Sequence, residues 1–450
     1  MAIISEFTRR VAPPALPEPP AQYAKRYNDE FNNVLRLYFN RLDSVLRELM
    51  ASTGPYPMYP SGPYADAFGR ARISEPFTLF DSQNRYDASG AFDTSASGGG
   101  STTYVVNEST IELDVGTVSG DEIIQETFKV FPYQPGKSLL VMNTFVMNEA
   151  KANLRQRVGY FGAQNGVFFE LDDTTVNLVM RSYVTGSAVD TKVAQASWNG
   201  DKLNGTGDSG YTLNLTQAQL FWQDFEWLGV GSVRCGFVIN GQFIVAHTFH
   251  NANINNTVYM TTAVLPIRYE ITNTDTTASA STMKQICSTV ISEGGYQQTV
   301  PKQVARRTAD TTVGTSFEPL VSIRLASDRL DSVIIPAGIP VLPSGSSPAY
   351  YEIALIKNPT LTGASWDTTT FPSVDYDVSA TALSGGNIVD LQYISGTNQS
   401  SSGISTEFNY NFDLQLGRTI GGTSDILTLA ARVFTGTSDI IGSLEFYELA

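Results

Sequence analysis

Residues 234–250 read RCGFVINGQFIVAHTFH, and this stretch decides the fold class. Asn240-Gly241 separates two runs of apolar and β-branched residues, and Asn-Gly favours a two-residue type I′ turn because both residues need a positive φ. The stretch therefore predicts a β-hairpin in which Arg234 lies opposite His247. Both faces of the hairpin are apolar, so we expect it to lie in the centre of a sheet or against a neighbouring subunit.

The two histidines of the chain, His247 and His250, both fall in this hairpin. Side chains of a strand alternate between its faces, so an odd separation places these two on opposite sides. Two-histidine metal motifs instead use a helix, where positions i and i+4 share a face. We therefore expect no shared metal site. The pattern predicts that His247 is a hydrogen-bonded sheet residue and that His250 anchors a loop.

The hairpin belongs to a long series of strand-like segments between residues 103 and 296. A second Asn-Gly at 165–166 predicts another tight turn, and no helical pattern interrupts the series. Many strands without helices between them predict an antiparallel β-sandwich, here jelly-roll-like. Residues 297–308 break the pattern and predict a linker, and residues 309–450 predict a second β-sandwich of the same kind.

The first hundred residues have a different pattern. Residues 1–22 contain five prolines, which prevent a regular helix and predict an extended arm, either a disordered tail or a segment that docks on a partner. Residues 23–50 predict a long helix. Residues 51–102 are rich in Gly, Pro and Ser and predict a linker, with one short strand candidate at 76–80.

Apolar residues in the predicted helix recur at alternating spacings of four and three, which is a heptad seam. The seam consists of Phe31, Leu35, Tyr38, Leu42, Val45 and Leu49. A helix with so wide an apolar face does not stay alone in water, so it packs either on its own protein or against copies of itself. The proline-rich and glycine-rich flanks favour copies, and we expect a homo-oligomer, with a trimer favoured.

Composition limits the function classes. The net charge of −15 opposes sequence-independent nucleic-acid binding, which requires Lys and Arg to neutralise phosphates. Cys235 and Cys287 form no CxxC pair, so we expect no zinc site, and two buried thiols are favoured over a disulfide between them. No apolar run reaches the roughly 20 residues of a membrane span, and the N-terminus lacks a secretory pattern. The sequence thus predicts a soluble protein made in a reducing compartment.

Candidate catalytic groups are few. No G-x-S-x-G is present, so a nucleophilic serine has no recognisable motif. The carboxylate pairs Asp224/Glu226 and Asp172/Asp173 match the residue types of glycosidases, but in strands and turns they are more often solvated. We expect no enzymatic activity and no cofactor.

Two further features allow a binding role. The segment 199–210 clusters Asp201, Asn204 and Asp208 with glycines and offers oxygen ligands for Ca²⁺, although its spacing is not that of an EF-hand and a plain loop is favoured. Trp222 shares a face of its strand with Asp224 and would stack on a sugar if exposed, whereas a covered sheet residue is the simpler interpretation.

Three stretches carry a resemblance to a known group of proteins: NNVLRLYFNRLD at 32–43, WLGVGSVRCGFVINGQF at 227–243 and LGRTIGGTSDILTLAARV at 416–433. With the proline-rich arm, they resemble virion structural proteins of tailed bacteriophages, many of them marine. The resemblance implies a virion component made in the host cytoplasm: a fibre, a neck or tail appendage, or a capsid decoration. It implies no catalytic residues.

From this resemblance and the pattern together we expect a non-enzymatic protein anchored to other virion proteins through residues 1–50. One alternative is a carbohydrate-binding or receptor-binding module of an appendage that contacts host-surface glycans. A third is a glycan-degrading tailspike, which the absence of a β-helix repeat makes the weakest of the three.

Overall fold

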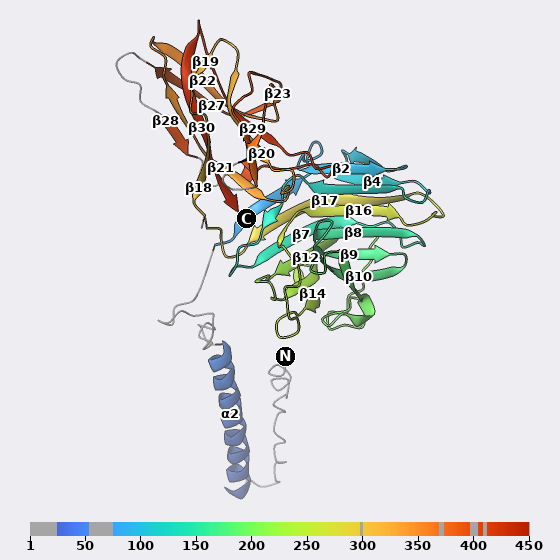
Figure 1. Cartoon of the computed structure of the whole chain (residues 1–450). Helices are drawn as coiled ribbons and strands as arrows, with labels where there is room; N and C mark the ends of the chain where they lie inside the picture. Colours follow the sequence, from blue (N-terminus) through green and yellow to red (C-terminus); the bar gives the residue numbers. More distant parts are fainter. Residues whose placement is uncertain are drawn as a thin grey trace. The chain divides into compact units, whose positions relative to one another are not determined.

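The computed structural model describes residues 25–53, 75–297, 300–368, 373–396, 404–407 and 412–449 (Figure 1). The chain divides into two compact units, Met1–Ser74 and Glu75–Ala450. The predicted arm, residues 1–22, lies outside the described residues. The regular elements described in the second unit are antiparallel strands and two short 3₁₀ helices, so the prediction of a mainly β protein with one long helix is confirmed. Within the described part of the chain, no helix is both long and apolar enough to cross a membrane.

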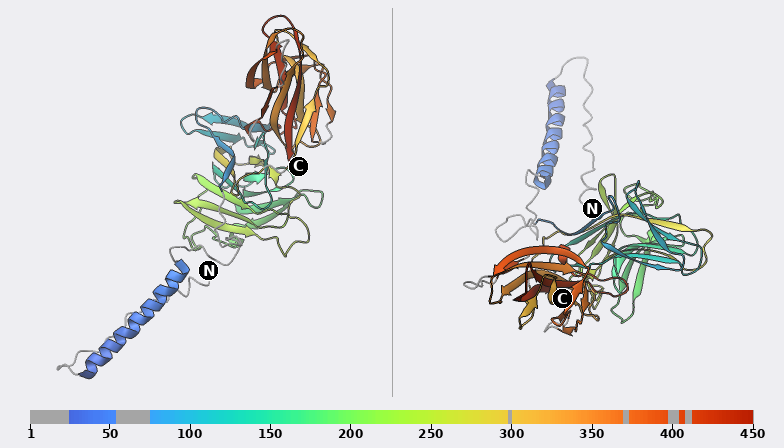
Figure 2. Two further views of the ribbon diagram at one scale, coloured as in Figure 1. Left: turned by 90° about the vertical axis from the view of Figure 1, so that its left-hand side faces the viewer. Right: turned by 90° about the horizontal axis from the view of Figure 1, so that it is seen from above.

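The first unit contains helix α2 (Lys25–Thr53), which agrees with the helix predicted over residues 23–50 (Figure 2). Its side chains are described from residue 28 to residue 42. Over that stretch no side chain is fully buried. The four seam residues Phe31, Leu35, Tyr38 and Leu42 are half-buried, and the side chains of Val45 and Leu49 lie outside the described residues.

Two facing sheets form the first sandwich. The first sheet runs in the order β14 (Gln242–Phe249), β13 (Val233–Ile239), β12 (Gln219–Phe225), β7 (Leu139–Val146), β17 (Ser281–Ser292), β4 (Thr110–Val115) and β3 (Ser101–Val105), with β1 (Phe77–Gln83) also on β17. The second runs β11 (Val189–Ala194), β10 (Thr175–Ser182), β9 (Gly166–Asp172), β8 (Leu154–Phe161), β16 (Ile267–Asn273), β5 (Glu122–Thr127) and β2 (Phe92–Ser97). β6 (Phe131–Pro132) pairs with β15 (Val264–Leu265), and η1 spans Gln195–Ser197.

The core of the first sandwich joins the inward faces of these two sheets. Phe169 of β9 packs on Phe145, Phe221 and Phe237 of the opposite sheet, with ring centroids 6.0, 5.7 and 5.2 Å away. All four rings are fully buried. Large aromatic residues therefore fill the space between the sheets, as the strand alternation predicts.

Part of the predicted linker belongs to this sandwich. Residues 51–102 were expected to connect the helix to the sheets, but β1 and β2 lie within that range, and β1 confirms the short strand candidate at 76–80. β1 pairs with β17, which follows it by some two hundred positions. A pairing partner so distant in sequence leaves no local signal, which is why the segment was misassigned.

The hairpin at Asn240-Gly241 is present, but its register and position correct the prediction. A bulge between Cys235 and Gly236 shifts the pairing, so that His247 lies opposite Cys235 rather than Arg234. β14 is at the edge of its sheet, not in the centre. The bulge turns the end of β14 over, because one extra residue exchanges the two faces of a strand.

Two further facing sheets form the second sandwich. One runs β18 (Lys302–Arg306), β30 (Ser438–Leu449), β21 (Val333–Pro343) and β28 (Ile404–Glu407), with β19 (Thr311–Val313) also on β30. The other runs β24 (Asp367–Thr368), β25 (Val374–Asp377), β20 (Glu318–Leu325), β29 (Ile426–Val433), β22 (Ala349–Lys357) and β27 (Asn387–Gly396). β23 (Thr360–Thr362) pairs with β26 (Ala382–Ser384). β18 falls inside the predicted linker 297–308, which is therefore partly strand.

A segment near the end of the second sandwich contacts the first. It begins with η2 (Phe412–Leu414), whose Phe412 carbonyl accepts a hydrogen bond from Lys129 Nζ at 2.9 Å. The Gln415 side chain donates to the Val130 carbonyl at 2.8 Å, and both groups are buried. The pKa of Lys129 is lowered by burial and by the charge of Lys357. These contacts make the two sandwiches one unit.

Candidate functional site

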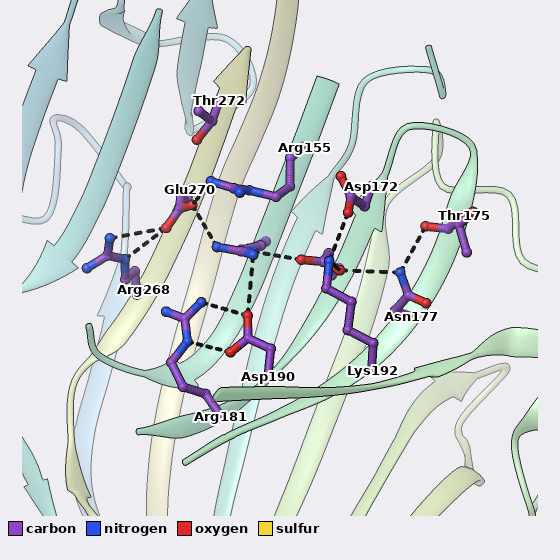
Figure 3. Close-up of polar contacts among 12 residues, drawn as sticks. Arg155, Asp172, Thr175, Asn177, Arg181, Asp190, Lys192, Arg268, Glu270 and Thr272 are labelled. Carbon is purple, nitrogen blue, oxygen red and sulfur yellow. Dashed lines mark hydrogen bonds and ion pairs between the residues drawn. The ribbon is translucent and has the colours of Figure 1, made fainter. Parts of the chain in front are cut away.

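A layer of charged residues covers the outward face of the sheet that contains β8 and β9 (Figure 3). We call it the charged layer; it consists of Arg155, Arg157, Glu170, Asp172, Arg181, Asp190, Lys192, Arg268 and Glu270. The strand register places these groups together, since Arg157 lies directly opposite both Glu170 and Glu270. Cross-strand pairs of opposite charge stabilise a sheet.

Glu270 is at the centre of the charged layer. Its side chain is 4% exposed and accepts hydrogen bonds from Arg157 at 3.2 Å and from Arg268 at 3.1 Å. Burial favours a raised pKa for Glu270, but the positive charges of Arg268, Arg157 and Arg155 outweigh it and hold the pKa below its ordinary value. The carboxylate therefore stays ionised, and every charge near it has a partner of opposite sign.

Aromatic rings lie beneath the charged layer. Phe161, Phe168 and Val179 form a small buried cluster on the same face of the sheet. The guanidinium carbon of Arg157 lies 5.1 Å from the Phe168 centroid, and that of Arg268 lies 5.6 Å from the Phe161 centroid. The arginines thus cover apolar surface while pairing with carboxylates, so the layer's role is to close this face. In the sequence, charged residues at positions i and i+2, as in Arg155/Arg157 and Arg268/Glu270, are the pattern that indicates this charged layer.

A cleft of about 650 Å³ opens elsewhere on the first sandwich, at the ends of β12, β13 and β14. We call it the cleft; its lining is Tyr133, Gly136, Lys137, Ser138, Asp224, Glu226, Leu228, Ser232, Arg234, Thr248 and His250. It combines carboxylates, cations, hydroxyls and two apolar side chains in one place. Such a mixture of a few polar groups with apolar walls is typical of small-ligand sites.

Asp224 and Arg234 form the polar floor of the cleft. They are cross-strand partners on β12 and β13, and Arg234 Nε donates to Asp224 Oδ2 at 2.8 Å. Ser138 Oγ donates to the other carboxylate oxygen. The Arg234 side chain remains 57% exposed although that of Asp224 is only 8% exposed. The carboxylate is thus committed to the protein, while the guanidinium is accessible to a ligand.

The loop 226–232 forms one wall of the cleft. It closes tightly, since the Glu226 amide donates to the Ser232 carbonyl at 3.0 Å and the Gly231 amide to the Trp227 carbonyl at 2.7 Å. Leu228 has a φ of +37° and is 54% exposed. A bulky residue in the left-handed region is strained, and such strain concentrates at binding and catalytic sites.

The two histidines lie on opposite faces, as predicted. His247 accepts a hydrogen bond from the Asn199 amide at 3.2 Å, and its pKa is lowered by burial and by the charge of His250. His250 lines the cleft, with Nδ1 3.4 Å from Ser232 Oγ. No group of three or more His, Cys, Asp or Glu residues able to hold a metal occurs in the part of the chain that the structure describes.

The predicted carboxylate pairs have different fates. Asp224 and Glu226 both line the cleft, so the interpretation as a purely solvated face misses their convergence. Asp172 instead pairs with Lys192 at 2.8 Å in the charged layer. Asp173 is in the β9–β10 turn, where it accepts the Asn153 amide at 2.5 Å. The second pair is therefore structural.

Trp222 is not available for stacking on a ligand. Its ring is 4% exposed and lies against Phe243, with centroids 5.6 Å apart. Gly236 on the neighbouring strand leaves room for it, because a Cβ there would approach the Trp222 ring to 2.9 Å. The interpretation of Trp222 as a covered sheet residue is confirmed, and the proposed glycan contact at this residue is wrong.

The segment 199–210 closes on itself. The carboxylate of Asp201 accepts the amides of Leu203 at 2.8 Å and Ser209 at 2.7 Å. Although burial favours a raised pKa, these backbone hydrogen bonds hold the pKa of Asp201 below its ordinary value. Asn204 accepts from Thr206 in the same way. Two of the three candidate Ca²⁺ ligands, Asp201 and Asn204, thus hold the loop.

No protein-family model matches the chain, and no curated protein sequence is similar to it. Among solved structures, the chain is similar to an endo-β-1,4-glucuronan lyase from the fungus Trichoderma reesei, with 11% identity and a TM-score of 0.34 over 49% of this chain and 96% of that one. The carbohydrate recognition domain of Emp47p matches with 8% identity and a TM-score of 0.30, over 50% and 100%. A carbohydrate esterase from the Shiga toxin-encoding bacteriophage phi24B matches with 10% identity and a TM-score of 0.28, over 48% and 99%. Similarity at this level identifies neither a family nor an activity.

Proposed function

We propose that this protein is a non-enzymatic structural component of a bacteriophage virion, which self-associates through helix α2. The observation that carries self-association is the heptad seam of α2, whose residues from Phe31 to Leu42 are only half-buried in the single chain. The virion part of the proposal is supported by the sequence resemblance of residues 32–43, 227–243 and 416–433.

A second copy of the helix is the occupant that fits the seam. The apolar seam residues of α2 are spaced alternately by four and three positions, which is the pattern of a left-handed coiled coil. In a coiled coil, each seam residue inserts between four residues of a neighbouring helix. Full burial of a Leu or Phe side chain contributes about 1.5–3 kcal/mol. Burial of the exposed part of the seam residues is the driving force that we expect for the trimer.

The test is the native mass of the full chain. We expect a trimer for the wild type and a loss of assembly for the double variant Leu35→Ser/Leu42→Ser. The matched control is Leu37→Ser, because Leu37 is 54% exposed and lies off the seam. A monomeric wild type, or equal loss of assembly in the control, would refute self-association through this seam.

The cleft favours a second function, carbohydrate binding by the first sandwich. Sugars present hydroxyls that both donate and accept hydrogen bonds, and apolar C–H faces. The cleft offers Arg234 as an exposed donor, Glu226 as an exposed acceptor and Leu228 as an apolar rim. In an oligomer, several weak sites of this kind would bind a surface with high avidity.

A glycan array with full-length protein tests the cleft. Arg234→Ala should abolish the signals that come from the cleft, while Arg329→Ala should keep all signals of the wild type. Arg329 is the matched control because it is also a half-exposed arginine near a carboxylate, with a side chain 48% exposed and 3.9 Å from Asp328. If Arg234→Ala keeps every signal of the wild type, the cleft does not bind sugars.

Degradation of host polysaccharide is the function that competes with binding alone. The specific observation in its favour is that Asp224 and Glu226 line the same cleft. Two carboxylates flanking a glycosidic bond are the catalytic pair of most glycosidases. We propose that they do not act as one, since Asp224 is engaged by Arg234 and Ser138. Depolymerisation that disappears in Glu226→Gln would overturn this.

A further inference from the structure

Three aromatic rings project from the second sandwich. Tyr350 on β22, Tyr393 on β27 and Phe434, which follows β29, are 72%, 65% and 53% exposed. We call them the aromatic band. The rings of Tyr393 and Phe434 have centroids 6.2 Å apart and an interplanar angle of 22°. Exposed aromatic clusters of this kind mark binding surfaces on soluble domains.

The strand register explains why the rings lie together. Glu352 of β22 lies opposite both Tyr393 and Arg432, so these three share one row across the sheet. The next row that faces the same side lies two residues further along each strand. Tyr351 faces the core at 1% exposed, opposite Val433, so their neighbours Tyr350 and Phe434 face outward. The band therefore extends across two neighbouring rows at one end of the sheet's outward face.

Polar groups at the base of the band are paired with one another. Tyr393 Oη donates to Glu352 Oε1 at 3.3 Å, and Arg432 Nε donates to Glu352 Oε2 at 2.5 Å. The guanidinium carbon of Arg432 lies 4.7 Å from the centroid of Phe317. The band thus combines flat apolar rings with hydroxyl and guanidinium donors, and it carries no unpaired charge among these residues.

Much of the rest of this sheet face is covered by the chain itself, although Leu391 on β27 is 39% exposed. Ala354, Ile356 and Ala430 are fully buried and packed under Phe317 and Leu383. At about 200 Å² per aromatic side chain, the exposed parts of the three rings sum to about 400 Å². Each partner in a stable protein interface contributes about 800 Å². The band is therefore too small for a second copy and suits a narrow, chain-like ligand.

We propose that the aromatic band binds a neutral polysaccharide by stacking sugar rings on Tyr350, Tyr393 and Phe434. A pyranose ring has an apolar C–H face that fits a flat aromatic ring and a rim of hydroxyls that reaches the polar base. The neutrality of the ligand follows from the paired charges at the base and from the net charge of −15, which repels an anionic polymer. This site is distinct from the cleft of the first sandwich and does not depend on it.

Affinity electrophoresis of the full chain in gels with soluble β-glucan, mannan or xylan tests the inference, with alginate as the acidic polymer. We expect retardation by at least one neutral polymer and none by alginate. Tyr393→Ala and Tyr350→Ala should each weaken the binding about tenfold, the effect of one lost ring contact. Tyr393→Phe should keep most of it because the stacking surface remains.

Tyr86→Ala is the matched control, since Tyr86 is 89% exposed but stands apart from the band in sequence and sheet. Equal retardation of Tyr393→Ala and wild type, retardation by alginate alone, or no retardation by any neutral polymer would overturn the proposal. A lower native mass of Tyr393→Ala would also overturn it, by making the band a self-association surface. Retardation that persists in Tyr393→Ala but disappears in Arg234→Ala would place the binding in the cleft and overturn the proposal.

Discussion

Replacing Glu270 with Gln tests whether the charged layer holds the first sandwich together. The change removes one negative charge from a site where three guanidinium groups converge, those of Arg155, Arg157 and Arg268. The side chain keeps its shape, so packing is preserved. What changes is that Arg155 loses its carboxylate, and that Arg157 and Arg268 each lose one of their carboxylates and keep Glu170 and Glu126.

The expected cost follows from burial. Removing one partner of a buried ion pair costs about 3–5 kcal/mol, whereas an exposed pair contributes about 0–1 kcal/mol. The Glu270 side chain is 4% exposed and the Arg157 side chain is 7% exposed, so this pair is a buried ion pair. For a domain of this size, 1 kcal/mol shifts Tm by about 2–4 °C. We therefore expect Glu270→Gln to lower the Tm of the first sandwich by about 6–20 °C.

Differential scanning calorimetry of the full chain measures this, because it resolves domains that unfold separately. The control is Asp331→Asn, since the Asp331 side chain is 63% exposed although it also pairs with an arginine, Arg418. A Tm shift in Glu270→Gln no larger than in the control would refute the reasoning. The double variant Glu270→Gln/Arg155→Met should recover part of the loss, because Glu270 is the carboxylate that pairs with Arg155 and the second change removes the charge left without it.

Four other perturbations have defined outcomes. The pKa values of Glu270 and Asp190 are below their ordinary values in the folded chain. The stability that these carboxylates provide is therefore present above the unfolded pKa near 4.5 and is lost as the pH falls through their folded pKa values. Between pH 5 and pH 3, the Tm of the wild type should fall more steeply than the Tm of Glu270→Gln. Arg418→Ala removes the link from Glu126 to Asp331, and limited proteolysis should then cleave between the sandwiches faster than in wild type. Gly236→Ala should destabilise by about 1–3 kcal/mol or more because its Cβ would lie 1.9 Å from the Ile244 carbonyl, while Gly314→Ala, with nothing within 4 Å, should have little effect in urea unfolding. Asp201→Ala should lower the free energy of unfolding by about 1–3 kcal/mol, and therefore the Tm, because two amide hydrogen bonds are lost. Added Ca²⁺ should not raise the Tm of the wild type.

The sequence predicted those parts of the fold that depend on neighbouring residues. The turn at Asn240-Gly241, the strand alternation and the helix at residues 23–50 are local patterns, and the structure has all three. The bulge at Cys235/Gly236 is different, because it depends on fitting the Trp222 ring and the neighbouring strand together. No local pattern indicates such a fit, so the register of the hairpin end was wrong.

The cleft and the aromatic band could be predicted only in part. Asp224 and Glu226 were recognisable as a pair, but their convergence with His250 depends on three separate strand ends. In the second sandwich, Tyr350, Tyr393 and Phe434 belong to segments far apart in the sequence and become neighbours only through pairing across β22. Trp222 shows that strand alternation alone does not predict exposure. It points to the outward face of its sheet and is still covered, with Phe243 against its ring.

β17 is the last strand of the first sandwich in sequence, yet it lies in the middle of its sheet, between β7 and β4, and also carries β1. A growing polypeptide that has left the ribosome only as far as β16 therefore has two unfinished sheet edges facing an empty slot. Strands β7 and β4 lack their common neighbour until residues 281–292 have been synthesised. Until then, the unpaired edges of these two strands are open to pairing with other chains. The first sheet of this domain can therefore be completed only after residues 281–292 have been synthesised.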